Sequence, residues 1–121
     1  MNRIIISILV LSVTSTLPVA ASALTQCFGE NPDWKLGLGT ETADLNYKQA
    51  HRFDVPHSTT ALKRDWPRAY TLVGQDATAI VILDQDACRI GAEEFPISAD
   101  ILTQDGSAAI MLTGCCRAND E

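Results

Sequence analysis

The stretch that decides the fold is Tyr70-Thr71-Leu72-Val73, the turn Gly74-Gln75-Asp76, and the return Thr78-Ala79-Ile80-Val81-Ile82-Leu83. Two short runs of strand-forming residues joined by polar turn residues are typical of an antiparallel hairpin. The second run is apolar on both of its faces, which predicts a central strand that is covered on both sides.

Similar short segments lie on either side of this hairpin. They combine strand-forming residues or an apolar/polar alternation with flanking turn residues. The segments are 34–38, 43–47, 52–55, 95–101 and 109–113. Asp105-Gly106 is a strong turn signal before the last of them. A short helical turn is expected at 60–65, ended by Pro67. Six to eight strands with little helix predict an all-β fold, a small antiparallel barrel or sandwich.

The first 23 residues have the features of a bacterial export signal. Arg3 precedes an apolar core at 4–11, Pro18 interrupts the segment, and Ala21-Ser22-Ala23 is a small-x-small cleavage site. The apolar run is too short to cross a hydrocarbon layer of about 30 Å. We therefore expect a signal peptide over 1–23, no membrane span, and a periplasmic or secreted protein.

Cleavage after Ala23 leaves residues 24–121, a length typical of a single domain. The whole chain carries 9 Lys and Arg against 15 Asp and Glu, and loss of Arg3 changes the net charge from −6 to −7. An acidic chain of this kind is a poor partner for nucleic acid or for anionic membrane surfaces.

Four cysteines, Cys27, Cys88, Cys115 and Cys116, predict two disulfides in an oxidising compartment. A bond between the adjacent pair would close a strained eight-membered ring, so Cys27 and Cys88 should each bond to one of that pair. The sequence leaves open which one. Neighbouring side chains in a strand point to opposite faces, so one of the pair should enter the core and the other leave the sheet. A lipid anchor on Cys27 is not expected, because Gln26 stands where a lipoprotein site requires a small residue.

Two separated segments carry a family resemblance: Cys27-Phe28-Gly29-Glu30-Asn31-Pro32-Asp33-Trp34, and the stretch from Cys88 through Phe95-Pro96 to Gly114-Cys115-Cys116-Arg117. Together they resemble a family of uncharacterised bacterial exported proteins of lipoprotein-like or membrane-like type. In those proteins a Cys-x-Gly-x-x-Pro-x-Trp segment opens the mature chain and a Gly-Cys-Cys motif closes it. The chain departs from the pattern at Asp33, where an aromatic residue is common, and at 89–92, where a polar run is replaced. The resemblance implies a β-domain of the cell envelope and no established reaction, so no catalytic residues carry over from it.

The most site-like stretch is Lys63-Arg64-Asp65-Trp66-Pro67-Arg68. Lys63, Arg64, Trp66 and Arg68 form a candidate binding loop, because Trp and Arg are frequent at the energetic centres of protein contacts and irregular segments often carry function. The partner would be an envelope protein, a glycan or a small ligand. The alternative is that Trp66 folds back as a lid on the barrel while the cations remain in solvent.

Other chemistry has weaker support in the residues. Thiol-redox or metal handling by Cys115-Cys116, with His51 or His57 as further ligands, lacks the Cys-x-x-Cys and paired-ligand spacings. A Ser/His/Asp triad lacks the sequence of a nucleophile elbow. Residues 84–86 begin like a calcium-binding loop, but the pattern of alternating carboxylates does not continue. We expect no catalytic residues, no metal and no cofactor. The preferred hypothesis is a non-catalytic binding or inhibitor-like module, with thiol or metal handling as the alternative. Small disulfide-bonded barrels that inhibit lysozyme are an architectural analogy only.

Overall fold

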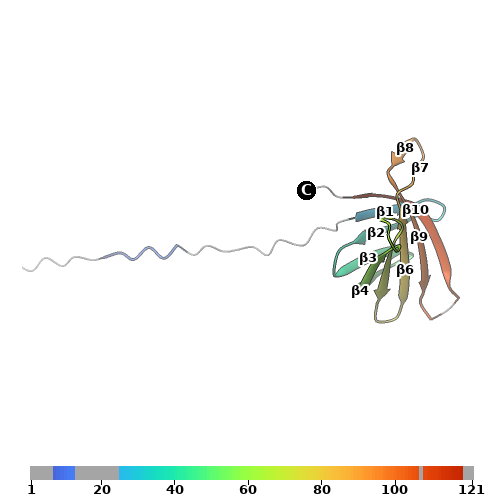
Figure 1. Ribbon diagram of the computed structural model, residues 1–121. Coiled ribbons are helices and arrows are strands. Elements are labelled where there is room, and N and C mark those ends of the chain that lie inside the picture. Colours follow the sequence, from blue (N-terminus) through green and yellow to red (C-terminus); the bar gives the residue numbers. More distant parts are fainter. Residues whose placement is uncertain (1–6, 13–24, 107, 119–121) are drawn as a thin grey trace, which may run out of the picture.

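Eight antiparallel strands form a closed barrel, and two further strands form a hairpin outside it, in a computed structural model that describes residues 7–12, 25–106 and 108–118 (Figure 1). Around the barrel the strands are β1 (Thr25–Gly29), β10 (Ile110–Ala118), β9 (Ile97–Gln104), β6 (Thr78–Asp84), β5 (Arg68–Val73), β4 (Gln49–Thr60), β3 (Thr42–Tyr47) and β2 (Trp34–Leu38). The extra hairpin pairs β7 (Cys88–Ile90) with β8 (Glu93–Phe95). The predicted all-β class with two disulfides is confirmed. Closure gives every barrel strand a hydrogen-bonded neighbour on each side.

Most of the predicted signal peptide lies outside the described residues, including the cleavage site at 21–23. Residues 7–12 are described as neither helix nor strand. Within the described ranges no helix is long and apolar enough to cross a membrane.

The barrel interior is filled by alternating side chains from all eight strands. Its largest fully buried members include Phe53, Leu36, Leu45 and Ile101, with small alanines such as Ala99 between them. Eight strands enclose a space that side chains can fill, so this interior is a packed core.

The prediction that the strand at 78–83, now β6, is covered on both sides is wrong. Val81 is fully buried inside the barrel, but Ile80 and Ile82 on the outer face are 44% and 43% exposed. β6 is central in the sense that it pairs with β5 and β9. In a closed barrel only the inner face needs cover, so apolar residues outside meet solvent.

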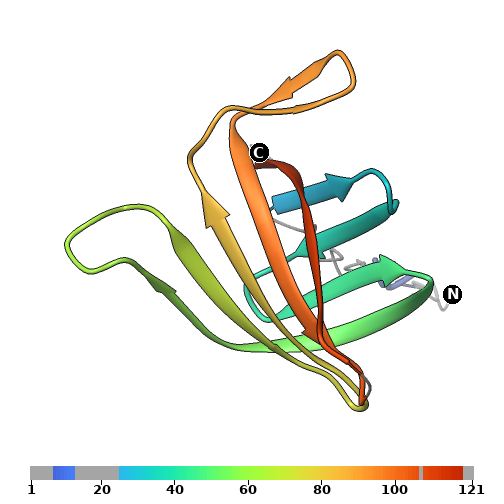
Figure 2. The ribbon, with the colours of Figure 1, turned by 90° about the vertical axis from the view of Figure 1, so that its right-hand side faces the viewer.

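The predicted helical turn at 60–65 is also wrong. β4 continues to Thr60, and the residues that follow form turns without a helix. The ladder between β4 and β5 shifts register between Asp54 and His57. Such a bulge bends a strand. Beyond the bulge β4 pairs with β5 and no longer with β3, while β5 stays paired with β6 along its whole length, and the loop that joins β4 to β5 projects from the barrel (Figure 2).

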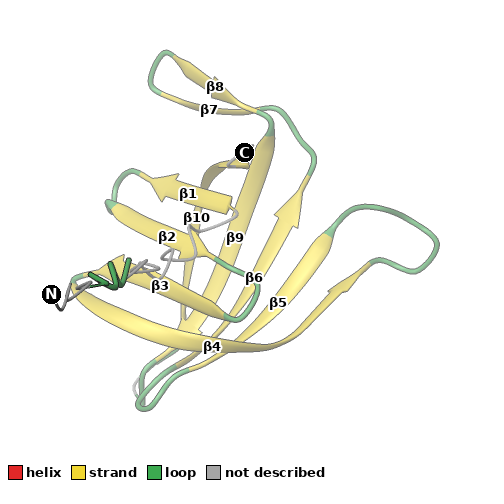
Figure 3. Ribbon diagram, turned by 90° about the vertical axis from the view of Figure 1, so that its left-hand side faces the viewer, coloured by secondary structure: helices red, strands yellow, loops and turns green. Residues whose placement is uncertain are grey.

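The two disulfides lie on opposite faces of β10. Cys27–Cys116 joins β1 to β10 inside the barrel, where the two residues are directly opposite each other. Cys88–Cys115 holds the β7–β8 hairpin against the outside of β10. The expectation of opposite faces is confirmed, yet Cys115 is as buried as Cys116, at 1% and 0% exposed. The disulfide to Cys88 and the contacts of β7 and β8 with β10 cover Cys115 on the outer face of the sheet. The hairpin lies outside the barrel (Figure 3).

Residues of the segments 27–34 and 113–116 pack together at the seam between β1 and β10. Trp34 packs across the backbone at Gly29 and Gly114, where an added Cβ would collide with the indole ring. The indole N–H donates a hydrogen bond to the carbonyl oxygen of Thr113 at 3.1 Å. The Cys27–Cys116 bond closes the same β1–β10 seam. These motif residues therefore build the barrel closure.

Candidate functional site

The first candidate site is the tip loop, residues 61–68, at the end of the β4–β5 hairpin. The backbone N–H of Ala61 donates to the carbonyl of Pro67 at 2.9 Å and closes the neck of the loop. The N–H of Arg64 donates to the carbonyl of Ala61 at 3.1 Å and tightens the turn. Leu62 at the tip is 93% exposed. The loop projects beyond the barrel strands (Figures 2 and 3). It is internally hydrogen-bonded and presents a nearly bare apolar side chain.

Arg68 and Trp66 form the base of the tip loop. The Arg68 guanidinium carbon lies 4.0 Å from the centroid of the Trp66 ring, and Nε of Arg68 donates to the carbonyl of Asp65 at 3.0 Å. Trp66 is half-buried and packs against the barrel core. An arginine stacked on a tryptophan face is a stabilising cation–π contact. The structure therefore brings these two predicted residues together and places Trp66 as a support of the loop.

The other two predicted residues, Lys63 and Arg64, lie exposed beside Leu62 at the tip. Lys63 has a positive φ of 62°, which turns the chain there. Sequence reasoning missed Leu62. The available signal was a large aliphatic residue followed directly by Lys63, Arg64 and Asp65, but a leucine in sequence does not show whether it points to the core.

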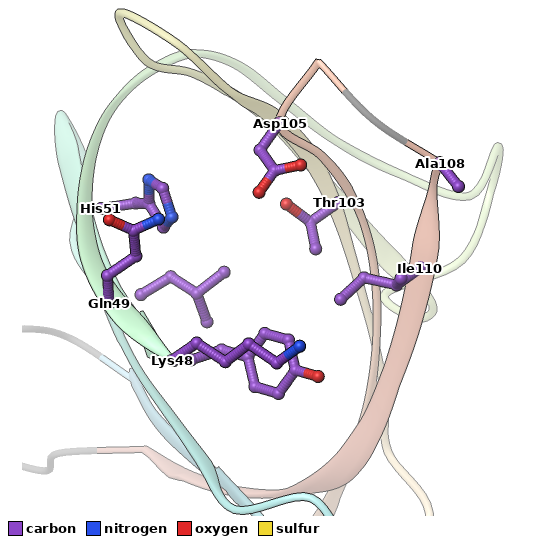
Figure 4. A pocket seen from close by; sticks show the side chains of 9 residues that line it. Lys48, Gln49, His51, Thr103, Asp105, Ala108 and Ile110 are labelled. Atoms are coloured by element: carbon purple, nitrogen blue, oxygen red, sulfur yellow. The ribbon is translucent and has the colours of Figure 1, made fainter.

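The second candidate site is the mouth cavity, an opening of about 150 Å³ at one end of the barrel (Figure 4). The residues that line it are Leu45, Tyr47, Lys48, Gln49, His51, Thr103, Asp105, Ala108 and Ile110. They come from the β3–β4 turn on one side and from β9, the following turn and the start of β10 on the other (Figure 4). The strand register makes this possible, because Leu45 is opposite His51 and Thr103 is opposite Ile110.

Polar and charged groups line the mouth cavity. The hydroxyl of Thr103 donates to the carbonyl of Thr78 at 3.3 Å. Lys48 has a φ of 62°, and its ammonium lies 5.5 Å from the centroid of the Tyr47 ring. Asp105 lies across the opening from Lys48 (Figure 4). The cavity therefore combines groups of both charges with an apolar wall.

Sequence reasoning considered His51 only as a metal ligand or a member of a catalytic triad. The structure places it in the mouth cavity, while His57 lies exposed on β4 opposite Thr71. The sequence did contain a signal for the cavity. Tyr47 and Thr103 stand at the ends of two alternating segments, where they put a polar side chain at a position that is apolar earlier in the segment. Recognising a shared cavity required knowing that their strands meet across the barrel mouth.

The remaining constellations have structural roles. None of the four cysteines is free. Glu93 and Glu94 on β8 pair with Arg117 at 3.2 Å and Arg89 at 2.7 Å. The Arg117 guanidinium also lies 5.4 and 5.1 Å from the ring centroids of Phe28 and Phe95, between β1 and the external hairpin. In the part of the chain that the structure describes, no three His, Cys, Asp or Glu residues are grouped to hold a metal.

Comparisons with known proteins give no relative: no family model, no curated protein and no solved structure matches the chain.

Proposed function

We propose that this protein is a non-catalytic, inhibitor-like binding module of the bacterial cell envelope, exported to the periplasm or secreted. The export-signal features of residues 1–23 and the resemblance of the cysteine motifs to exported bacterial proteins support the location. Two disulfides in a small domain are typical of oxidising compartments. The tip loop is the surface that engages the partner.

The observation that carries this proposal is the 93% exposure of Leu62 on a loop held by its own hydrogen bonds. Burying a leucine side chain in a partner contributes about 1.5–3 kcal/mol. A loop that is already ordered loses less conformational entropy on binding, so more of that energy becomes affinity. The tip loop is therefore built as an insertion element.

Charge indicates the kind of partner. Lys63 and Arg64 directly follow Leu62 and are exposed, on a protein whose net charge is −6. A local cationic patch on an acidic protein steers the tip toward acidic surfaces and turns the rest of the molecule away. Among an envelope protein, a glycan and a small ligand, we favour a protein with an apolar pocket rimmed by carboxylates, because only an apolar pocket makes use of Leu62.

The test is capture of partners from an envelope extract by the immobilised protein, followed by affinity measurement with the purified partner. Leu62→Ser and Arg64→Glu should each weaken binding by about tenfold or more. The matched controls are Leu102→Ser and Arg52→Glu, which change exposed residues of the same types on the barrel wall. A partner whose affinity is unchanged by both tip variants, or a glycan bound in preference to any protein, would refute the proposal.

The alternative of thiol or metal handling at Cys115-Cys116 has no specific observation in its favour. The two sulfurs belong to different disulfides, and the two cysteines are no more than 1% exposed.

A further inference from the structure

We propose that the mouth cavity binds a small zwitterion, meaning an organic molecule with one ammonium group, one carboxylate group and a short apolar body. This site is separate from the tip loop and does not depend on the function proposed for it. Its lining residues come from the β3–β4 and β9–β10 regions of the barrel.

The inward-facing side chains change from apolar to polar toward the mouth of the barrel. On β3 the inward positions run from Ala43 and Leu45 to Tyr47, and on β9 they end in Thr103 after Ile101. Filling the barrel would require only further apolar side chains at these positions. In ligand sites, a few polar groups set in an apolar wall fix the orientation of the bound molecule.

Two opposite charges lie at the mouth cavity. Lys48 and Asp105 carry opposite charges on facing sides of the opening (Figure 4). A ligand with a single charge would be attracted by one of these residues and repelled by the other. A zwitterion has a favourable partner for each of its charged groups.

The hydrogen-bonding groups of Thr103 and Asp105 set the orientation of the ligand. The single hydroxyl proton of Thr103 is directed at the Thr78 carbonyl, so its oxygen can act toward the cavity only as an acceptor. The two oxygens of the Asp105 carboxylate offer about four acceptor positions, which leaves room for a ligand beside contacts within the protein. The ammonium end therefore belongs near Thr103 and Asp105, and the carboxylate end near Lys48.

The size of the cavity limits the body of the ligand. Its volume of about 150 Å³ matches cavities that hold benzene. Leu45, Ile110 and the ring of Tyr47 supply apolar contact. These dimensions suit a body of about three to five carbons with its charged ends at the rim.

The turn at Lys48 fixes where its ammonium lies. Lys48 alone lies between the paired residues Tyr47 and Gln49, and its φ of 62° is the left-handed conformation that such a tight turn uses. This places the ammonium 5.5 Å from the centroid of the Tyr47 ring, at the rim of the cavity.

The experiment titrates the full folded protein with L-valine and with 4-aminobutyrate, followed by chemical shifts of backbone amides. The comparison compounds are 3-methylbutyrate and 2-methylpropylamine, which are valine without its ammonium and without its carboxylate. We expect at least one zwitterion to shift the amides at 45–51 and 103–110 and to bind about tenfold more tightly than either singly charged analogue. The zwitterion that binds more tightly reports the spacing of the two charges. Equal binding of the singly charged analogues, or no response to either zwitterion at millimolar concentration, would overturn the proposal.

Variants test the assignment of the charges. Lys48→Met and Asp105→Asn should each reduce zwitterion affinity to that of the singly charged analogues. Lys35→Met and Asp100→Asn are matched controls, since both residues are exposed and do not line the cavity. Unchanged affinity in both mouth variants would contradict the inference. The ligand comparison uses the unaltered protein, so it decides the question even if a variant does not fold. Arg64→Glu in the tip loop should leave zwitterion binding unchanged, which separates this proposal from the one above.

Discussion

Removing the Cys27–Cys116 disulfide should destabilise the protein more than removing Cys88–Cys115. The first bond closes the β1–β10 seam inside the barrel and joins residues 89 apart in sequence. The second attaches the β7–β8 hairpin to the outside of β10 and joins residues 27 apart. We compare two double variants: Cys27→Ala with Cys116→Ala, which removes the first bond, and Cys88→Ala with Cys115→Ala, which removes the second.

The magnitude follows from the loop that each bond closes in the unfolded chain. An isolated loop of about 90 residues corresponds to about 4.6 kcal/mol, and one of about 28 residues to about 3.6 kcal/mol. The second disulfide shortens the path between Cys27 and Cys116 to roughly 60 residues, which lowers the first value to about 4.3 kcal/mol. Cys27 and Cys116 are also 0% exposed in the barrel core. Deleting their sulfur atoms leaves a cavity that adds about 1 kcal/mol.

Urea unfolding followed by tryptophan fluorescence measures both losses. We expect about 5 kcal/mol for the seam bond out of a total of about 5–15 kcal/mol, together with a steeper dependence on urea because the unfolded chain expands. The external bond should cost about 1 kcal/mol less than the seam bond, because it closes a shorter loop and because Cys88 is only half-buried whereas Cys27 is fully buried. A smaller loss for Cys27→Ala with Cys116→Ala than for the external pair would refute the reasoning.

Three further changes test the barrel by the same unfolding measurement. Gly114→Ala should cost about 2–3 kcal/mol, because its Cβ would meet the β1 backbone and Trp34; a neutral result would contradict the close packing at the seam. Trp34→Phe should cost about 1–3 kcal/mol by removing the donor to the Thr113 carbonyl, and a stabilised variant would argue against that bond. Ile80→Ser should cost less than about 1 kcal/mol, whereas Val81→Ser should cost several. Equal losses for the last two would show that β6 is covered on both faces.

The sequence predicted a strand segment in seven of the eight barrel strands and, in the alternating ones, which side chains point inward. It did not predict β1, β7 or β8, and it ended β4 at Val55, five residues before its end. Alternation at 34–38 and at 97–101 is read from neighbouring residues, because successive side chains of a strand point to opposite faces. The same rule placed Cys115 and Cys116 on opposite faces before their partners were known. The apolar outer face of β6 misled this reasoning, because local pattern does not show whether a second layer covers a strand.

The barrel closure, the disulfide partners, the exposure of Leu62 in the tip loop and the mouth cavity followed only from the tertiary structure. Closure depends on β1 meeting β10, and this pairing sets Cys27 opposite Cys116. The loop that joins β4 to β5 projects from the barrel, and Leu62 is exposed on it (Figure 2). Lys48 and Asp105 share a cavity only because the strands that carry them face each other across the barrel mouth. Periodicity reports the face of each residue, whereas strand order and register decide which faces meet.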